Sequence, residues 1–325
     1  MTNLLDNFDV VLADLDGVVY EGTAAIRDAV SAVSRIQSTH RLGFVTNNSS
    51  RKPEAIVDQL AGFGINTLAT DIVSSGQAGV ELLATLVEPG SKIYVVGGEG
   101  LRFYVTEAGF ELVDSADANP AAVIQGFAPD VSWRNLAEAS FAIQRGAKWV
   151  ATNQDWTLPQ ERGMAPGNGT LVSAVHTAVG QLPLVAGKPE PAIFSTAVNR
   201  FSAKRPLFIG DRLDTDIIGA NRSGIPSLLV LTGVSRAKEA LAAKPEERPA
   251  YIIDTLAGLF EKYQEPKQTK RGFKLGQSEV ELLGNRVVVV SGDPKAVETL
   301  RCACAVIWNT GLAIYALDVD PELYE

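Results

Sequence analysis

Short apolar runs alternate with segments of helical periodicity over the first 80 residues. Residues 8–13 (FDVVLA) and 41–46 (RLGFVT) are nearly continuous apolar runs. Such runs are typical of buried parallel strands. After the second run, apolar positions recur at helical spacing, with Pro53 in the expected first turn. The predicted helix ends at Gly62 or Gly64.

The same alternation returns near residue 182. Residues 182–186, 206–210 and 227–232 read as strands. A helix is predicted from Pro191, and another over residues 216–223. Strands that alternate with helices favour a parallel, doubly wound sheet with right-handed crossovers. We therefore expect an α/β fold with a Rossmann-like core.

Between these two halves lies another α/β stretch. We interpret residues 81–180 as an inserted α/β domain, although one larger continuous sheet is the alternative. The core domain would then combine residues 1–80 with residues 181–263. The strand-like runs of the insertion are residues 92–96, 122–125 and 149–152.

The composition changes beyond residue 263. Residues 264–272 are polar and basic without periodicity, and they indicate a linker. Residues 286–290 and 312–317 are strand-like, whereas 293–305 has a helical pattern. We predict a linker and a small α+β appendage over 264–325. So small a segment is expected to dock on the rest of the chain or on a partner.

Composition and charge narrow the classes of function. The 325 residues carry a net charge of −9, which disfavours nucleic acid and anionic membranes as partners. Neither a signal peptide nor an apolar run of about 18 residues is visible, so we expect a soluble cytoplasmic protein. Cys302 and Cys304 are separated by one residue, which favours reduced thiols over a disulfide.

The first strand ends in Asp14-Leu15-Asp16-Gly17. Residues i and i+2 of a strand share a face, so both carboxylates can project from the carboxyl end of a parallel strand. That edge is where ligands bind in open α/β sheets, and a hard divalent cation would offset the repulsion. Taken alone, the pattern also fits an Asp-rich turn. The absence of a Glu at loop position 12 argues against a calcium EF-hand.

Three further motifs follow strand ends. Thr46-Asn47-Asn48-Ser49-Ser50 offers a hydroxyl, amides and helical N–H groups to a phosphate, although simple N-capping explains it as well. Lys188, between Gly187 and Pro189, could bind a phosphate as a point charge, or could be an ordinary surface lysine. Residues 210–216 (GDRLDTD) could complete a magnesium site, or could be an acidic helix N-terminus.

The order of these motifs is more specific than any one of them. An acid pair, a hydroxyl, a lysine and an acid cluster, each at a strand end, resemble the haloacid dehalogenase superfamily over residues 8–262. The sequences at residues 14–20 (DLDGVVY) and 210–217 resemble the subgroup with a large inserted α/β cap, the NagD-like and 4-nitrophenyl phosphatases. Residues 151–155 and 166–170 resemble its cap signatures.

The resemblance implies a Mg²⁺-dependent phosphatase. It makes Asp14 the nucleophile and Asp16 the general acid and base. The metal ligands would be Asp14, Asp16 through its main-chain carbonyl, Asp211 and, in support, Asp216. Thr46, Asn47 and Lys188 would bind the phosphate, and Asp155 would reach the substrate from the cap.

The substrate is expected to be a small phosphorylated metabolite. The tail resembles that of glycerol-3-phosphate phosphatases with an acetyltransferase-like C-terminal part, although no Gly-rich pyrophosphate loop is present. Glycerol 3-phosphate is therefore the first choice. Phosphoglycolate, pyridoxal phosphate, sugar phosphates and nucleoside monophosphates stay open, as does a non-catalytic regulatory module. The resemblance also allows a homodimer through the cap.

Overall fold

The computed structural model describes residues 3–160 and 162–324, which divide into two compact units. One unit combines Met1–Leu42 with Ala203–Glu325, and the other is Gly43–Ser202. Within the described residues, no helix combines the length and the apolar character needed to cross a bilayer. The domain boundaries expected near residues 80, 180 and 263 stay predictions.

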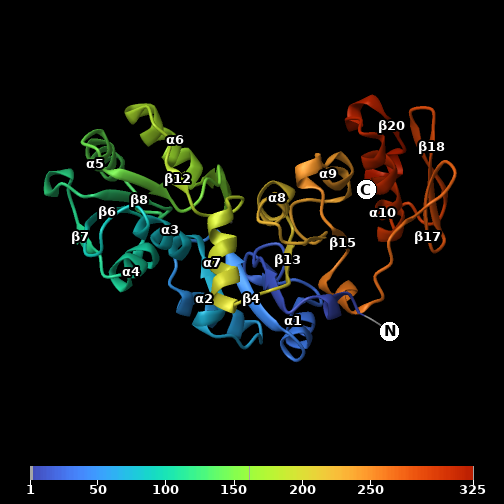
Figure 1. Cartoon of the computed structure of the whole chain (residues 1–325), viewed down its shortest axis with the longest axis horizontal. Helices are drawn as coiled ribbons and strands as arrows, with labels where there is room; N and C mark the ends of the chain where they lie inside the picture. The colour runs from blue at the N-terminus through green and yellow to red at the C-terminus, as the bar shows by residue number, and fades with distance from the viewer. Residues whose placement is uncertain (1–2, 161, 325) are drawn as a thin grey trace. The chain divides into compact units, whose positions relative to one another are not determined.

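Four parallel strands form the main sheet of the first unit, in the spatial order β15-β14-β13-β1 (Figure 1). Their residues are almost all buried, as the continuous apolar runs predicted. The strands are β1 (Val10–Ala13), β13 (Pro206–Gly210), β14 (Ser227–Val230) and β15 (Tyr251–Ile253). The unit also holds the hairpin β2 (Tyr20–Glu21) and β3 (Ala24–Ala25), and the helices α1 (Ala29–Gln37), α8 (Ile218–Arg222) and α9 (Ala237–Ala242).

A five-stranded parallel sheet, in the order β12-β9-β8-β6-β7, dominates the second unit (Figure 1). Helices α3 and α4 pack on one face of it, and α5 and α6 pack on the other. The elements are α3 (Ser75–Ala84), β6 (Lys92–Val96), α4 (Glu99–Glu107), β7 (Glu111–Val113), β8 (Ala122–Gln125), α5 (Trp133–Gln144), β9 (Lys148–Ala151), α6 (Asn168–Val179) and β12 (Leu184–Val185).

The second unit also holds two smaller groups of elements. Strand β4 (Arg41–Thr46) pairs in parallel with β5 (Ile72–Ser74), and α2 (Pro53–Gly62) lies between them in sequence. Strands β10 (Thr157–Gln160) and β11 (Gly163–Pro166) form a hairpin. Helix α7 (Pro191–Phe201) packs against α3. The predicted end of the second strand and the predicted helix from Pro53 are therefore both present.

Strand β12 differs from the prediction. We expected residues 182–186 to be a strand of the core sheet, but Leu184 and Val185 pair with Val150 and Ala151 of β9. The apolar pattern indicates a strand without saying which neighbour supplies its hydrogen bonds, and this strand is not buried, since Leu184 is exposed and Val185 is half-buried. Lys188 therefore follows the edge strand of the five-stranded sheet.

The C-terminal residues form a sheet with one long helix (Figure 1). The elements are β16 (Lys267–Gln268), β17 (Gly272–Leu275), β18 (Ser278–Leu283), β19 (Arg286–Ser291), α10 (Val297–Thr310) and β20 (Asp318–Val319). Three expectations are corrected. The predicted linker contains a strand at Lys267–Gln268, the helix begins at Val297 instead of Asp293, and the 312–317 run holds a 3₁₀ turn.

Helix α10 shares one hydrophobic cluster with the main sheet of its unit. Leu300, Cys304 and Ile307 belong to the same buried cluster as Leu229 and Ile252. Hydrogen bonds cross the same boundary, from Arg301 Nε to the Ile252 carbonyl at 2.8 Å and from Trp308 Nε1 to the Ala240 carbonyl at 3.2 Å. The expectation that the appendage docks on the rest of the chain is confirmed.

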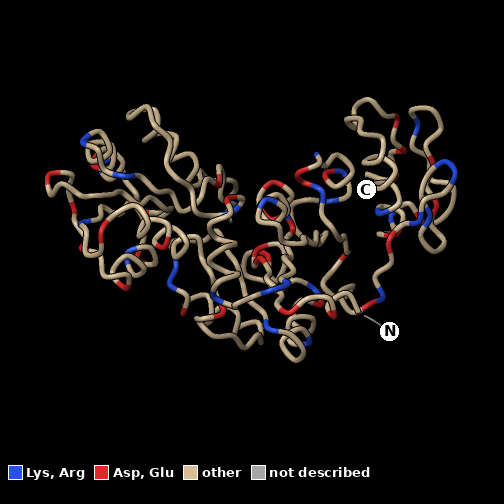
Figure 2. The backbone as a smooth tube through the Cα atoms, in the orientation of Figure 1, with Lys and Arg blue, Asp and Glu red and all other residues tan. Residues whose placement is uncertain are grey.

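Charged positions are interspersed along both units. Figure 2 shows Asp and Glu alternating with Lys and Arg, without one continuous basic stripe.

Candidate active site

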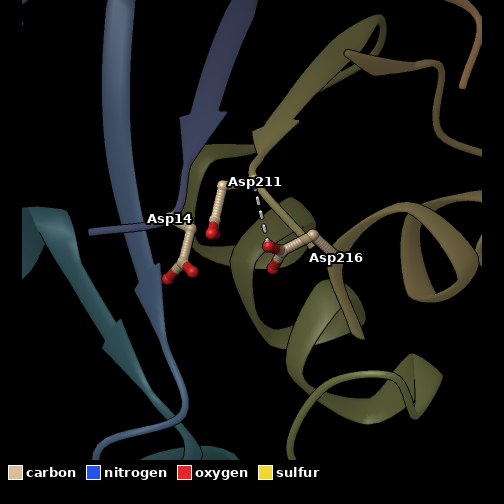
Figure 3. A group of neighbouring side chains, drawn as sticks. All are labelled: Asp14, Asp211 and Asp216. Carbon is tan, nitrogen blue, oxygen red and sulfur yellow. Dashed lines mark hydrogen bonds between the residues drawn. The ribbon is translucent and has the colours of Figure 1, made fainter. Parts of the chain in front are cut away.

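Three buried carboxylates meet at one edge of the first unit's main sheet. Asp14 directly follows β1, and Asp211 directly follows β13 (Figure 3). Asp216 comes from the single π-helical turn Leu213–Ile217 that leads into α8. One carboxylate oxygen from each of the three lies within 4.8 Å of the others. The structure brings together three of the four residues predicted as metal ligands.

Glycines make room for the Asp211 side chain. A Cβ on Gly17 would stand 2.3 Å from Asp211 Oδ2, and one on Gly233 would stand 1.9 Å from it. Gly17 also has a φ of +77°, in the left-handed region. Both positions consequently require glycine, because the main chain packs directly on the carboxylate.

Main-chain donors fix the orientation of two carboxylates of the trio, those of Asp211 and Asp216. Val234 N donates to Asp211 Oδ2 at 2.7 Å. The amides of Asp211 and Arg212 both donate to Asp216 Oδ2, at 3.2 and 3.1 Å. Figure 3 draws the first of these two bonds as a dashed line.

The Asp16 side chain lies outside the trio. Among the described residues, the cluster of possible ligand atoms contains Asp14, Asp211 and Asp216. Asp16 is exposed, and Tyr20 Oη donates a hydrogen bond to its Oδ2 at 3.3 Å. An exposed carboxyl beside a buried one can exchange protons with bound molecules, which is what a general acid and base needs.

Asp214 faces a different partner. Burial alone would raise the pKa of its carboxyl, but the hydrogen bonds and charge of Arg212 outweigh that effect and hold the pKa below its ordinary value. The Asp214–Arg212 ion pair, at 2.8 Å, is solvent-accessible. The acidic run therefore divides into two buried residues at the trio and one surface residue.

Lys188, Thr46 and Asn47 lie in the second unit. Lys188 is only 3% exposed, and its Nζ donates to the Val45 carbonyl at 3.3 Å. Asn47 Oδ1 accepts from Lys188 N at 2.8 Å, and Asn47 Nδ2 donates back to the Lys188 carbonyl at 3.1 Å. Thr46 Oγ1 accepts from Asn48 N at 3.1 Å. Hydrogen bonds therefore join Lys188 to Asn47, and Thr46 directly precedes Asn47 in the chain.

Asp155 joins the same group of residues. Asn47 Nδ2 donates to Asp155 Oδ1 at 3.2 Å. Asp155 lies two residues before the β10–β11 hairpin, with Trp156 between them. The one predicted site residue of the insertion therefore lies beside the Asn47–Lys188 pair.

The carboxylate trio fits a hard divalent cation. All its side-chain ligand atoms are oxygens, the set preferred by Mg²⁺ and Ca²⁺ over softer metals. Octahedral Mg²⁺ places oxygen ligands about 2.9 to 4.2 Å apart, close to the spacing of the trio. Three buried carboxylates also repel one another, and a bound cation removes that cost.

Sequence patterns missed several residues that support the site. Thr232 Oγ1 donates to the Gly17 carbonyl at 2.6 Å, and Ser235 Oγ accepts from Leu213 N at 3.1 Å. Asn153 Nδ2 donates to the Asn47 carbonyl at 2.8 Å. Asn153 lies within the 151–155 cap signature, which did not indicate its contact with Asn47. For Thr232 and Ser235 the only available signal was position, because polar residues are common in loops. Residues 232–235 follow a buried strand, as the catalytic motifs do.

Family models match both halves of the chain. Residues 11–111 match a family described as haloacid dehalogenase-like hydrolase, and residues 185–259 match a second, HAD-hydrolase-like family. Together these two segments cover more than half of the 325 residues.

Similar sequences are phosphatases. The chain is 44% identical over 259 residues to a D-glycerol 3-phosphate phosphatase of Mycobacterium tuberculosis, a match that covers 80% of this chain and 73% of the relative. It is 35% identical over 256 residues to an acid sugar phosphatase of Staphylococcus saprophyticus, covering 78% and 96% of the two chains.

Solved structures agree in fold. A glycerol phosphate phosphatase from M. tuberculosis in complex with magnesium has a TM-score of 0.90 at 37% identity, covering 100% of this chain and 97% of that one. A thermostable double-mutant NPPase from Geobacillus stearothermophilus has a TM-score of 0.71 at 33% identity, covering 77% and 97%. The predicted Rossmann-like α/β core with a cap is confirmed, and the chain belongs to the haloacid dehalogenase-like hydrolase family.

Proposed function

We propose that this hydrolase is a Mg²⁺-dependent phosphatase that converts glycerol 3-phosphate to glycerol through a phosphorylated Asp14. The buried trio of Asp14, Asp211 and Asp216 is the observation that carries the metal-dependent chemistry. The substrate is supported by the relative of 44% identity and by the magnesium-bound glycerol phosphate phosphatase that matches the whole chain, C-terminal part included.

The cation would be held by Asp14, by the main-chain carbonyl of Asp16 and by Asp211. Asp216 would support it through bound waters or a hydrogen bond. When bound, Mg²⁺ supplies positive charge that offsets repulsion between the Asp14 carboxylate and the phosphate.

Asp14 and Asp16 have different roles in the reaction. An Asp14 oxygen attacks phosphorus, and the phosphorus–oxygen bond to the alcohol breaks as Asp16 donates a proton to the departing alkoxide. Asp16 then takes a proton from water as that water attacks the aspartyl phosphate, which releases inorganic phosphate and restores Asp14. The phosphate dianion of an arriving substrate would raise the pKa of Asp16 and favour the protonated form that the first step requires.

Thr46, Asn47 and Lys188 would bind the non-bridging phosphate oxygens. An ammonium group offers three donors, and charge stabilisation is the main task in phosphoryl transfer. Asp155 would approach the substrate's hydroxyl groups from the cap. The cytoplasmic location and the homodimer stay predictions.

A panel of phosphorylated metabolites tests the substrate. We expect glycerol 3-phosphate to have the highest kcat/KM, and EDTA to abolish turnover until Mg²⁺ is restored. Sugar phosphates form the second candidate, because an acid sugar phosphatase is 35% identical. A sugar phosphate or nucleotide that led by tenfold, about 1.4 kcal/mol of transition-state preference, would contradict the substrate assignment.

A pair of variants in one acidic run tests the metal site. Asp211→Asn should raise the Mg²⁺ concentration for half-maximal activity more than tenfold and lower kcat about 100-fold, because a buried ligand loses its charge. Asp214→Asn is the matched control, since its carboxylate pairs with Arg212 at the surface. Measurement of activity as a function of Mg²⁺ concentration gives both kcat and the Mg²⁺ concentration for half-maximal activity. Equal effects of the two substitutions would contradict the assignment.

A further inference from the structure

A series of buried amides connects helix α6 to Lys188 within the second unit. Asn168, the first residue of α6, donates through Nδ2 to the Asn153 carbonyl at 2.8 Å. Asn153 donates through Nδ2 to the Asn47 carbonyl at 2.8 Å. Asn47 in turn exchanges two hydrogen bonds with the main chain of Lys188. Asn168 and Asn153 are 1% and 4% exposed, whereas Asn47 is half-buried, so water is excluded mainly from the bond between Asn168 and the Asn153 carbonyl.

Both ends of the Asn153 amide are used. While Nδ2 donates to Asn47, Oδ1 accepts from Asp155 N at 3.3 Å. Only an amide offers a donor and an acceptor at this position and length. One side chain therefore fixes the Asn47 backbone and the start of the Asp155 loop together.

Close main-chain contacts leave the segment 152–155 little freedom. A Cβ on Gly187 would stand 2.4 Å from the Thr152 carbonyl oxygen, and one on Gly169 would stand 2.4 Å from the Gln154 carbonyl oxygen. The segment is thus in direct main-chain contact with the residue before Lys188 on one side and with the first turn of α6 on the other. A displacement of Asn153 must move these neighbours.

We propose that Asn153 is a positioning residue that holds Lys188 and Asp155 in place for binding of the substrate phosphate. The inference rests on the proposed function, because it takes Lys188 as a phosphate ligand. Asn153 acts through Asn47, and Asn168 supports it from α6. The inserted domain would in this way set the geometry of the phosphate-binding lysine.

The test is Asn153→Ala in the full chain, with Gln144→Ala as the matched control. Gln144 also donates an amide hydrogen bond to a carbonyl, that of Ala178, but from an exposed position. We expect Asn153→Ala to raise the Kd of inorganic phosphate, measured by titration calorimetry with Mg²⁺, about tenfold. KM for 4-nitrophenyl phosphate should rise equally. The Mg²⁺ half-saturation constant should change less than twofold, because the carboxylate trio is in the other unit.

A double-mutant cycle separates positioning from folding. In a Lys188→Met background, Asn153→Ala should add less than a twofold change in the phosphate Kd, since its effect passes through the missing ammonium. Additive effects would overturn the proposal, as would a phosphate Kd within twofold of the wild type. If Asn153→Ala does not fold, Asn168→Ala replaces it, with an expected rise of about threefold and the same criteria.

The proposed function can fail separately. A wild type that binds phosphate but turns over neither 4-nitrophenyl phosphate nor glycerol 3-phosphate would overturn the function, while the phosphate Kd still decides the role of Asn153. A wild type that hydrolyses 4-nitrophenyl phosphate alone would overturn only the substrate.

Discussion

At the scale of single residues, the carboxylate trio depends on positions that lack a side chain. Gly17 and Gly233 face Asp211 so closely that any Cβ would overlap its carboxylate. This packing orients the Asp211 carboxylate by close contact with the main chain, without the use of another polar side chain. Glycines that precede or follow a catalytic motif can therefore matter as much as the charged residues.

Gly17→Ala should impair the metal site, because the new methyl group would collide with Asp211 Oδ2. We expect kcat to fall at least 100-fold and the Mg²⁺ requirement to rise. Gly22→Ala is the control: its φ of +57° imposes a similar backbone strain of about 1 kcal/mol, but nothing lies within 4 Å of the added Cβ. Steady-state kinetics and a thermal melt of each variant separate the two effects. A Gly17→Ala enzyme that matched Gly22→Ala would contradict the steric account.

The residues of the trio could be predicted from the sequence because of their positions. Asp14 and Asp211 each follow a buried strand directly, and Asp216 lies in the turn that comes after the second of these strands. Asp14 and Asp211 are adjacent to apolar runs whose parallel pairing brings their ends together. Ser235 carried no comparable signal, and Asn153 was marked only as part of the 151–155 cap signature, without a role of its own. Their roles depend on hydrogen bonds to residues far away in the sequence, and an asparagine or serine in a loop satisfies many arrangements equally well. The individual roles of Asp14, Asp16, Thr46 and Lys188 stay predictions until variants are measured.

At the scale of elements, α10 buries the chain's two cysteines. Both Cys302 and Cys304 are buried, although residues two positions apart point to different sides of a helix. Burial, with Glu279 and Glu298 nearby, raises the pKa of Cys302 to about 11, and burial raises that of Cys304 further. The reactive thiolate is therefore scarce at neutral pH, in addition to being inaccessible.

Native protein should consequently react slowly with Ellman's reagent at pH 8. We expect both thiols to be titrated within minutes in guanidinium chloride, and less than a tenth of that amount in buffer over the same time. Raising the pH toward 10 should accelerate labelling of the native protein only slightly, because access and ionisation both limit it. Rapid release of one equivalent from the native protein would contradict the burial of Cys302 and Cys304.

The patterns along the sequence predicted which segments are strands or helices better than they predicted which strands pair with one another. The runs at 92–96, 122–125 and 206–210 form strands with those bounds. The prediction failed for β12 because hydrogen bonding to β9 involves only two residues, Leu184 and Val185. It also failed at residues 312–317, a continuous apolar run that forms a 3₁₀ turn at Ile314–Ala316 instead of a strand.

At the scale of the whole molecule, the C-terminal module is not a detachable appendage. Leu300 and Ile307 of α10 complete the hydrophobic cluster that includes Leu229 and Ile252 of the main sheet. Arg301 also lies over the Tyr263 ring, 4.2 Å from its centroid, and donates to the Ile252 carbonyl. The family resemblance predicted the hydrolase and its reaction class, which the comparisons confirm, but it left the function of this module open.

Removal of residues 264–325 should therefore destabilise the remaining chain. Deleting α10 would expose apolar residues of the main-sheet cluster, and we expect Tm to fall by more than 10 °C or the protein to aggregate. Leu300→Ala tests the same packing more gently, with an expected loss of about 2–4 kcal/mol in the free energy of unfolding. Leu312→Ala, at a position 51% exposed, should cost less than about 0.5 kcal/mol. Calorimetry and denaturant unfolding measure these changes in stability. A truncated chain as stable as the full chain would contradict the role of α10 in the shared cluster.

The shared cluster also makes α10 a natural reporter. Trp308 lies on this helix, whereas the other tryptophans, Trp133, Trp149 and Trp156, belong to the second unit. Since Asp14, Asp211 and Asp216 lie in the same cooperative unit as Trp308, a cation bound by the native state alone would delay unfolding as seen by this indole. In a variant whose other tryptophans are replaced, unfolding followed by Trp308 fluorescence would report whether a cation is bound at the carboxylate trio, without a measurement of enzyme activity.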